Sequence, residues 1–129
     1  MSVQHPRQRT VAVIGASNNR NKYGNKAVRA YAAMGYQVYP ISPHEDQIEG
    51  LRAYKSVLDV PGPVDRVTIY VPPKVGMRVI EEVARKGVAE VFLNPGTDSE
   101  ELLMRARELG LEPVVACSIR DVGVSPSTL

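Results

Sequence analysis

The stretch TVAVIGASNNRNKYG, residues 10–24, passes from an apolar run through three small residues into a polar, basic turn. The apolar run is typical of a buried strand. Apolar side chains then recur at helical spacing from Gly24 to Met34, so the turn should lie at a helix N-terminus. Unpaired amides and the helix dipole favour an anion there. The turn therefore predicts a phosphate site, whose candidate contacts are Gly15, Ala16, Ser17, Asn18, Arg20, Lys22, Tyr23 and Gly24.

The spacing of this turn departs from the known nucleotide fingerprints. Ser17 and Arg20 occupy the second and third glycine positions of the dinucleotide pattern, and no Gly-Lys-Ser/Thr follows as a P-loop requires. The end of the next strand, Ile41-Ser42-Pro43, also lacks the acidic residue that binds a ribose hydroxyl. A nucleotide site thus remains favoured, while an NAD site is disfavoured.

Charge is unevenly distributed along the 129 residues, although the net charge is only +2. No carboxylate precedes Glu45, whereas this segment holds Arg7, Arg9, Arg20, Lys22, Lys26 and Arg29. Such asymmetry suits a multiply phosphorylated small molecule and gives no argument for nucleic acid. We interpret Arg7, Arg9 and Arg29 as solvated surface cations, and leave both readings open for Arg20 and Lys22.

The composition indicates one globular domain over residues 1–129. A single cysteine, Cys117, excludes an intramolecular disulfide, and the two histidines have no metal-ligand spacing. No apolar run approaches the ~20 residues that span a membrane. We therefore expect a cytoplasmic protein with no membrane partner.

Strand and helix patterns alternate along the chain. Strands are expected over 11–14, 37–41, 66–71, 88–93 and 113–116, and helices over about 24–34, 74–86 and 99–109. Residues 49–63 resemble a loop or short edge strand with a helical turn, and Asp98 or Ser99 is a credible N-cap. Right-handed crossovers would stack these units into an α/β, Rossmann-like, doubly wound parallel sheet of about five strands, with three α/β/α layers.

Ligands of such sheets bind outside the carboxyl ends of the strands. The loops that meet there are 15–24, Ser42-Pro43, Pro72-Pro73-Lys74 and residues 94–97. Three of them contain proline, which makes a rigid, partly apolar wall suited to a base or a pantetheine-like arm.

The segments Val13–Ser17, Gly35–Pro43, Gly50–Val57 and Val64-Asp65 together resemble the coenzyme A-binding domain family over nearly the whole chain. Members are single Rossmann-like domains similar to the nucleotide-binding domain of the succinyl-CoA synthetase α subunit. The resemblance implies a CoA or acyl-CoA ligand. It implies that Gly15, Ala16 and Ser17 hold the pyrophosphate, with Arg20 and Lys22 near phosphates. It further implies that Ser42, Pro43, Val71, Pro72, Pro73 and Lys74 line the adenosine and the start of the arm, and that Asn94, Pro95 and Gly96 close the site.

Two segments depart from the family pattern. Ser42-Pro43 stands where members commonly have Asn-Pro, and Asn94-Pro95-Gly96 replaces a glutamine-containing turn. The phosphohistidine of the synthetase belongs to a different domain, so ligase chemistry does not transfer to this one.

The sequence offers no Ser-His-Asp, paired-carboxylate or metal constellation at the expected site. His44 is expected in an exposed loop, and Cys117 as a small buried apolar residue. We therefore expect a non-catalytic CoA-binding protein that forms a homodimer or serves an acyl-CoA enzyme. The alternatives are a small NAD(P)-binding oxidoreductase or redox sensor, and a subunit of an acyl-CoA ligase.

Overall fold

The computed structural model describes residues 7–129, and its centre is a parallel sheet. Strand β1 (Thr10–Ile14) pairs with β2 (Gln37–Ile41) on one side and with β5 (Arg66–Ile69) on the other. Strands β6 (Glu90–Leu93) and β7 (Val114–Val115) complete the order β2-β1-β5-β6-β7. The expected Rossmann-like α/β sheet of five parallel strands is confirmed.

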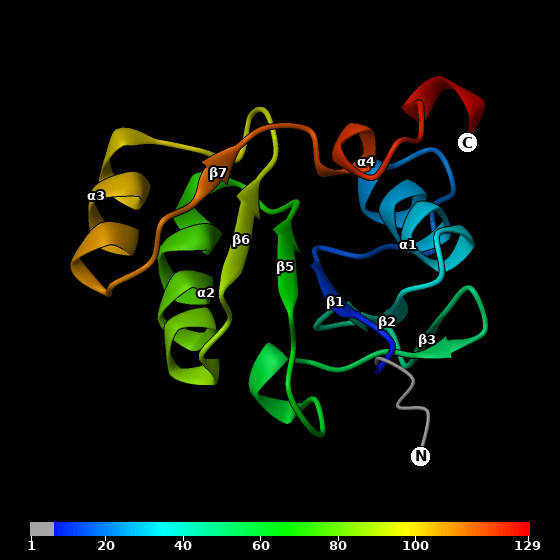
Figure 1. The fold of residues 1–129 in the computed structure, drawn as a ribbon, viewed down its shortest axis with the longest axis horizontal. Coiled ribbons are helices and arrows are strands. Elements are labelled where there is room, and N and C mark those ends of the chain that lie inside the picture. Colours follow the sequence, from blue (N-terminus) through cyan, green and yellow to red (C-terminus); the bar gives the residue numbers. More distant parts are fainter. Residues whose placement is uncertain (1–6) are drawn as a thin grey trace, which may run out of the picture.

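Helices cover both faces of this sheet (Figure 1). Helices α1 (Tyr23–Ala33) and α4 (Ser118–Asp121) lie on one face, and α2 (Pro73–Lys86) and α3 (Glu100–Glu108) lie on the other. No helix in the described part of the chain is long and apolar enough to cross a membrane.

Alternation along β1 divides the core into two clusters. Val11 and Val13 pack with the residues of α1 and α4, while Ala12 and Ile14 pack with those of α2 and α3. All four side chains are buried, as expected for the central strand of a sheet covered on both faces. The apolar run that leads into the turn at Gly15 is thus packed on both sides.

Most element boundaries differ from the expected ones by one or two residues. Strand β5 ends at Ile69, although the Tyr70 amide still donates to Ile14 O at 2.8 Å; Pro72 then removes a donor. Helix α2 ends at Lys86 and is capped by Gly87, which adopts a left-handed conformation (φ 80°). Helix α3 begins after Ser99, whose Oγ accepts a hydrogen bond from the Leu102 amide, so the expected N-cap is confirmed.

The region before β5 contains no crossover helix, as the sequence indicated. It forms a hairpin of β3 (Gln47–Ile48) and β4 (Leu51–Arg52), followed by the 3-10 turn Val57–Asp59. Two elements at the C-terminal end were not expected from the sequence: α4 and the 3-10 turn Pro126–Thr128. Both pack on the α1 side of the sheet (Figure 1).

Candidate functional site

A cleft of ≈ 990 Å³ opens at the carboxyl ends of β1 and β5. From β1 the chain continues through α1 to β2, and from β5 through α2 to β6 in the opposite direction. This is the switch point at which α/β sheets bind ligands, and the volume suits a cofactor. Its lining comprises Gly15, Ala16, Ser17, Lys22, Tyr23, Gly24, Ser42, Pro43, His44, Glu45, Tyr70, Val71, Pro72, Asn94, Pro95, Gly96, Thr97, Cys117, Arg120 and Pro126.

Two glycines shape the turn after β1. Gly15 adopts φ +88°, and a Cβ there would lie 2.9 Å from the Tyr70 carbonyl carbon and oxygen. At Gly24 a Cβ would lie 2.1 Å from Gly15 O. Gly24 therefore lets α1 approach the turn closely, which is the task of the third glycine in a dinucleotide fingerprint. The turn between Gly15 and Gly24 is longer than that of the dinucleotide fingerprint, so Gly24 does not fit the spacing of the G-x-G-x-x-G pattern.

The start of α1 is open to an anion. Within residues 7–129, no side chain caps its first turn, and that turn holds no acidic residue. By contrast, α3 is capped by Ser99 and carries Glu100 and Glu101 in its first turn. Because uncapped amides and the dipole attract negative charge, the α1 start supplies the favourable field of the cleft.

The first amides of the turn are used by the fold itself. Gly15 and Ala16 both donate to Ile41 O, at 3.1 and 3.2 Å. Ser17 O accepts a hydrogen bond from Asn25 Nδ2 at 2.8 Å, and Asn25 is fully buried in α1. These bonds fix the turn against β2 and α1. Asn25 was not predicted, because a polar residue on a helix gives no sign in the sequence of what it contacts.

Four predicted site residues lie outside the cleft lining: Asn18, Arg20, Pro73 and Lys74. Asn18 donates through Nδ2 to Glu45 Oε2 and Gln47 O, at 2.9 and 3.0 Å. Arg20 pairs with Glu49 in the β3–β4 turn at 3.5 Å. Pro73 and Lys74 form the first turn of α2. The other predicted residues are brought together in the lining.

Asn94 lines the cleft, yet its side chain is occupied by protein partners. Nδ2 donates to Thr68 Oγ1 at 2.7 Å and to Ile69 O at 3.0 Å. Oδ1 accepts from the Ser118 amide at 2.9 Å. The residue is 3% exposed. Asn94 therefore positions the start of α4 against the sheet.

Several lining residues were not among those predicted. Cys117, Arg120 and Pro126 come from the C-terminal segment, which has no helical or strand periodicity from which its place at the cleft could be predicted. Cys117 is half-buried rather than buried. His44 lies in an exposed loop, as expected, at the cleft margin beside Glu45. Tyr70 and Thr97 complete this group.

Tyr70 stays protonated in the cleft. Burial raises its pKa to about 12, more than hydrogen bonds from Ser118 and Thr68 lower it. Its hydroxyl lies 3.2 Å from Ser118 Oγ. The phenol is thus a neutral hydrogen-bonding group of the wall.

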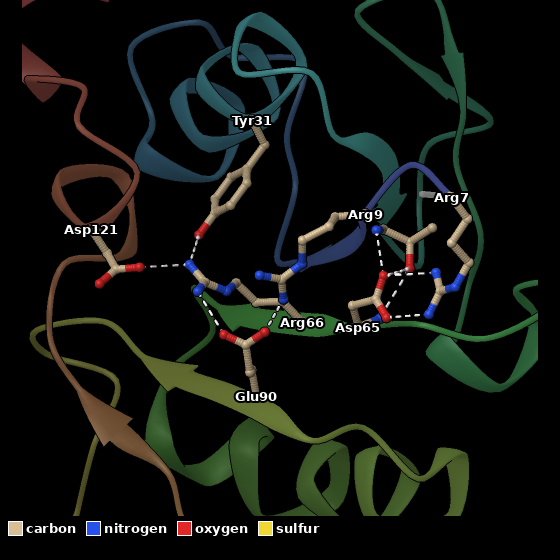
Figure 2. A network of polar contacts seen from close by, with 8 residues as sticks. Arg7, Arg9, Tyr31, Asp65, Arg66, Glu90 and Asp121 are labelled. Atoms are coloured by element: carbon tan, nitrogen blue, oxygen red, sulfur yellow. Dashed lines mark hydrogen bonds and ion pairs between the residues drawn. The ribbon is translucent and has the colours of Figure 1, made fainter. Parts of the chain in front are cut away.

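Among the six positive residues of the first third of the chain, Arg7, Arg9 and Arg20 form ion pairs within the described residues. Arg7 binds Asp65 and Arg9 binds Glu90, so these two are more than solvated surface cations (Figure 2). Arg29 Nε donates to Asn25 Oδ1 at 2.8 Å. Lys22 remains at the cleft. Over residues 7–129 no cluster of histidine, cysteine and carboxylate side chains could hold a metal ion.

Comparison with known proteins identifies a family. Residues 9–121 match the model of the CoA binding domain. The α subunit of an ADP-forming acetate–CoA ligase (II) from Pyrococcus furiosus is 41% identical over 88 residues, which are 66% of this chain and 19% of that protein. An uncharacterised protein from Bacillus subtilis is 24% identical, and the match spans 88% of this chain and 84% of that one. This chain thus spans less than a fifth of the ligase subunit.

The fold has a solved counterpart of similar size. A conserved hypothetical protein from Pyrococcus furiosus superposes with a TM-score of 0.81 at 36% sequence identity. The superposition covers 88% of this chain and 98% of that one.

Proposed function

Because the chain belongs to the CoA-binding domain family, we propose that it binds CoA or an acyl-CoA in the cleft between β1 and β5. The observation that carries the proposal is the turn after β1, which places the uncapped start of α1 at the switch point. The pyrophosphate lies at Gly15, Ala16 and Ser17, and Lys22 contributes positive charge.

The loops after β2, β5 and β6 suit the less polar portions of the ligand. Pro43, Val71, Pro72 and Pro95 belong to three separate loops and line the cavity. A wall of fixed, partly apolar backbone favours an adenine ring or a pantetheine arm, because little conformational entropy is lost when it is covered.

We propose that the domain holds its ligand without chemical change. Among the described residues, no hydroxyl or thiol of the lining is hydrogen-bonded to a histidine ring or a carboxylate, the arrangement that activates a nucleophile. The function is then storage, sensing or presentation of the ligand to a partner.

A calorimetric titration tests this function. The purified protein, stripped of ligand, is titrated with CoA, and NAD, NADP and ATP are titrated in parallel. We expect CoA to bind most tightly, with micromolar or lower Kd. Preference for NAD or NADP would establish the dinucleotide alternative instead, and no heat with any of the four would reject a nucleotide-binding role.

A second candidate is a subunit of an acyl-CoA ligase. It is supported by the relatives whose names describe ligase α subunits, the Pyrococcus furiosus ligase I subunit matching 94% of this chain. This candidate predicts a stable complex with an ATP-binding subunit. Affinity capture from the native host, followed by mass spectrometry, would detect that subunit. A free monomer or homodimer in the same lysate would reject it.

A further inference from the structure

Two cationic side chains line the cleft: Lys22 at the start of α1, and Arg120 in α4. In the described part of the chain neither has a carboxylate at ion-pair distance or a side-chain hydrogen bond. Arg20 differs, since it pairs with Glu49 and lies outside the lining. The positive charge available inside the cleft therefore comes from Lys22 and Arg120.

The backbone on both sides of Arg120 is firmly anchored. Ile119 is fully buried in the core cluster of the α1 face. Asp121 accepts a hydrogen bond from Arg66 Nη1 at 2.8 Å, and Figure 2 shows Arg66 reaching Asp121, Tyr31 and Glu90 from the start of β5. Arg120 thus lies between a buried residue, Ile119, and an ion-paired one, Asp121.

Residue 118 adds a third anchor. The Ser118 amide donates to Asn94 Oδ1 at 2.9 Å, and its Oγ lies 2.6 Å from Thr68 Oγ1. Its carbonyl accepts from the Tyr31 hydroxyl at 3.2 Å. Among residues 118–121, Ser118, Ile119 and Asp121 therefore contact other parts of the fold. Arg120 is exposed at the cleft. The backbone of Arg120 is therefore already ordered, and only its side chain loses freedom when it binds an anion.

The other charged group of the lining does not cancel this field. Glu45 accepts a hydrogen bond from Asn18 at 2.9 Å. It is the one carboxylate among the described lining residues, which include the two cations Lys22 and Arg120. Apart from His44, the charged side chains of the lining are two cations and one carboxylate. The excess favours a polyanionic ligand.

We infer that Arg120 binds a phosphate of the ligand together with Lys22, and takes the role that the family resemblance implied for Arg20. The guanidinium is planar and always charged, so it can donate two hydrogen bonds to one phosphate. The inference rests on the proposed function for the identity of the ligand, and it assigns the C-terminal segment to the binding site.

The test compares Arg120→Gln and Arg120→Lys with wild type by calorimetric titration. The probes are CoA, ADP, which has the pyrophosphate without the arm, and pantetheine, which has the arm without phosphate. Arg120→Gln should raise the Kd for CoA and ADP about tenfold or more, since a charged hydrogen bond is lost. Arg120→Lys should give a smaller rise. The Kd for pantetheine should not change.

Arg107→Gln is the matched control, because Arg107 lies on α3 and outside the cleft lining. It should bind all probes as wild type does. Raising the salt concentration should weaken CoA binding to wild type more than to Arg120→Gln, because screening acts on the charge that this variant lacks.

The outcomes separate this inference from the proposed function. Equal Kd values for CoA and ADP in wild type and Arg120→Gln, with equal melting temperatures, would overturn the role of Arg120 while leaving CoA binding intact. Arg120-dependent binding of ADP without any preference for CoA would support Arg120 and reject CoA as the ligand. Absence of binding to either probe by wild type would reject both.

Discussion

Ser17 is the residue at which added charge should affect the ligand most. It lies in the cleft lining, directly after the two amides that bind Ile41 O. In Ser17→Asp a carboxylate would face the phosphates at short range, so CoA affinity should fall by several kcal/mol, on the order of 3. The fold should survive.

Titration and thermal melting of Ser17→Asp check this prediction. Ala89→Asp is the control, because it adds the same charge in an exposed loop before β6, at the opposite edge of the sheet. Unchanged CoA affinity in Ser17→Asp with a normal melting profile would place the ligand elsewhere.

Asn94 is a second residue whose side chain we expect to be important, because its hydrogen bonds stabilise the fold more than they contact the ligand. Asn94→Asp removes the two donors to Thr68 Oγ1 and Ile69 O and buries a carboxylate beside a carbonyl. We expect about 3 kcal/mol lower free energy of unfolding at neutral pH. Denaturant unfolding measures it, with Asn21→Asp in the exposed loop as control. A loss no larger than that of the control would show that these hydrogen bonds stabilise little.

At the scale of elements, the packing of α1 against the turn after β1 is the closest contact of the site. In Gly24→Ala the new Cβ would lie 2.1 Å from Gly15 O, so the helix must shift. We expect a loss of about 2 kcal/mol in the free energy of unfolding, together with weaker CoA binding.

Gly76→Ala in α2 is the matched control for Gly24→Ala. There the added Cβ meets only the end of the Leu102 side chain, at 3.0 Å. Thermal and denaturant unfolding of both variants should show the larger loss for Gly24→Ala. Equal stability of the two variants would mean that α1 can move away from the turn without cost.

The N-terminal segment is joined to β5 through Asp65. Its carboxylate accepts hydrogen bonds from Arg7 and from the Thr10 amide, at 2.8 Å for the latter (Figure 2). The Arg7 hydrogen bond is the main cause that lowers the pKa of Asp65 to about 2. Because the folded pKa lies below the unfolded one, the stabilisation is present above about pH 4 and is lost as the pH falls towards 2.

The free energy of unfolding as a function of pH checks this contribution. Wild type should lose stability between about pH 4 and 2, and Asp65→Asn should lack this part of the pH dependence. Asp98→Asn serves as control, since Asp98 lies in the loop before α3 and, within residues 7–129, its carboxylate has no ion-pair partner. Parallel curves for wild type and Asp65→Asn would contradict the assignment.

Elements differed in how far the sequence could predict them. The long helices and central strands were predictable because apolar periodicity and glycine or serine caps mark them locally. Helix α4 was not, because its four residues bear one buried apolar side chain, Ile119, and its position depends on Asn94, Arg66 and Tyr31 from distant segments. The surroundings of Arg20 were not predictable for the same reason: Arg20 lies near the turn in sequence, but it pairs with Glu49 from a distant segment and lies outside the cleft lining.

At the scale of the whole molecule, the strand order sets the position of the cleft. The chain leaves β1 and β5 in opposite directions, so the loops after both strands separate and leave a crevice. Helix α1, the β2 loop and the C-terminal segment then supply residues of its lining. The fold class and this edge of the sheet followed from the sequence, whereas the C-terminal wall required the tertiary structure.

The measurement that tests this account most directly is a crystal structure of the protein grown with CoA. We predict density for the ligand between β1 and β5, with its pyrophosphate at the turn formed by Gly15, Ala16 and Ser17, and with phosphate oxygens within hydrogen-bond distance of Arg120. CoA bound at any other surface, with this cleft empty, would contradict the account.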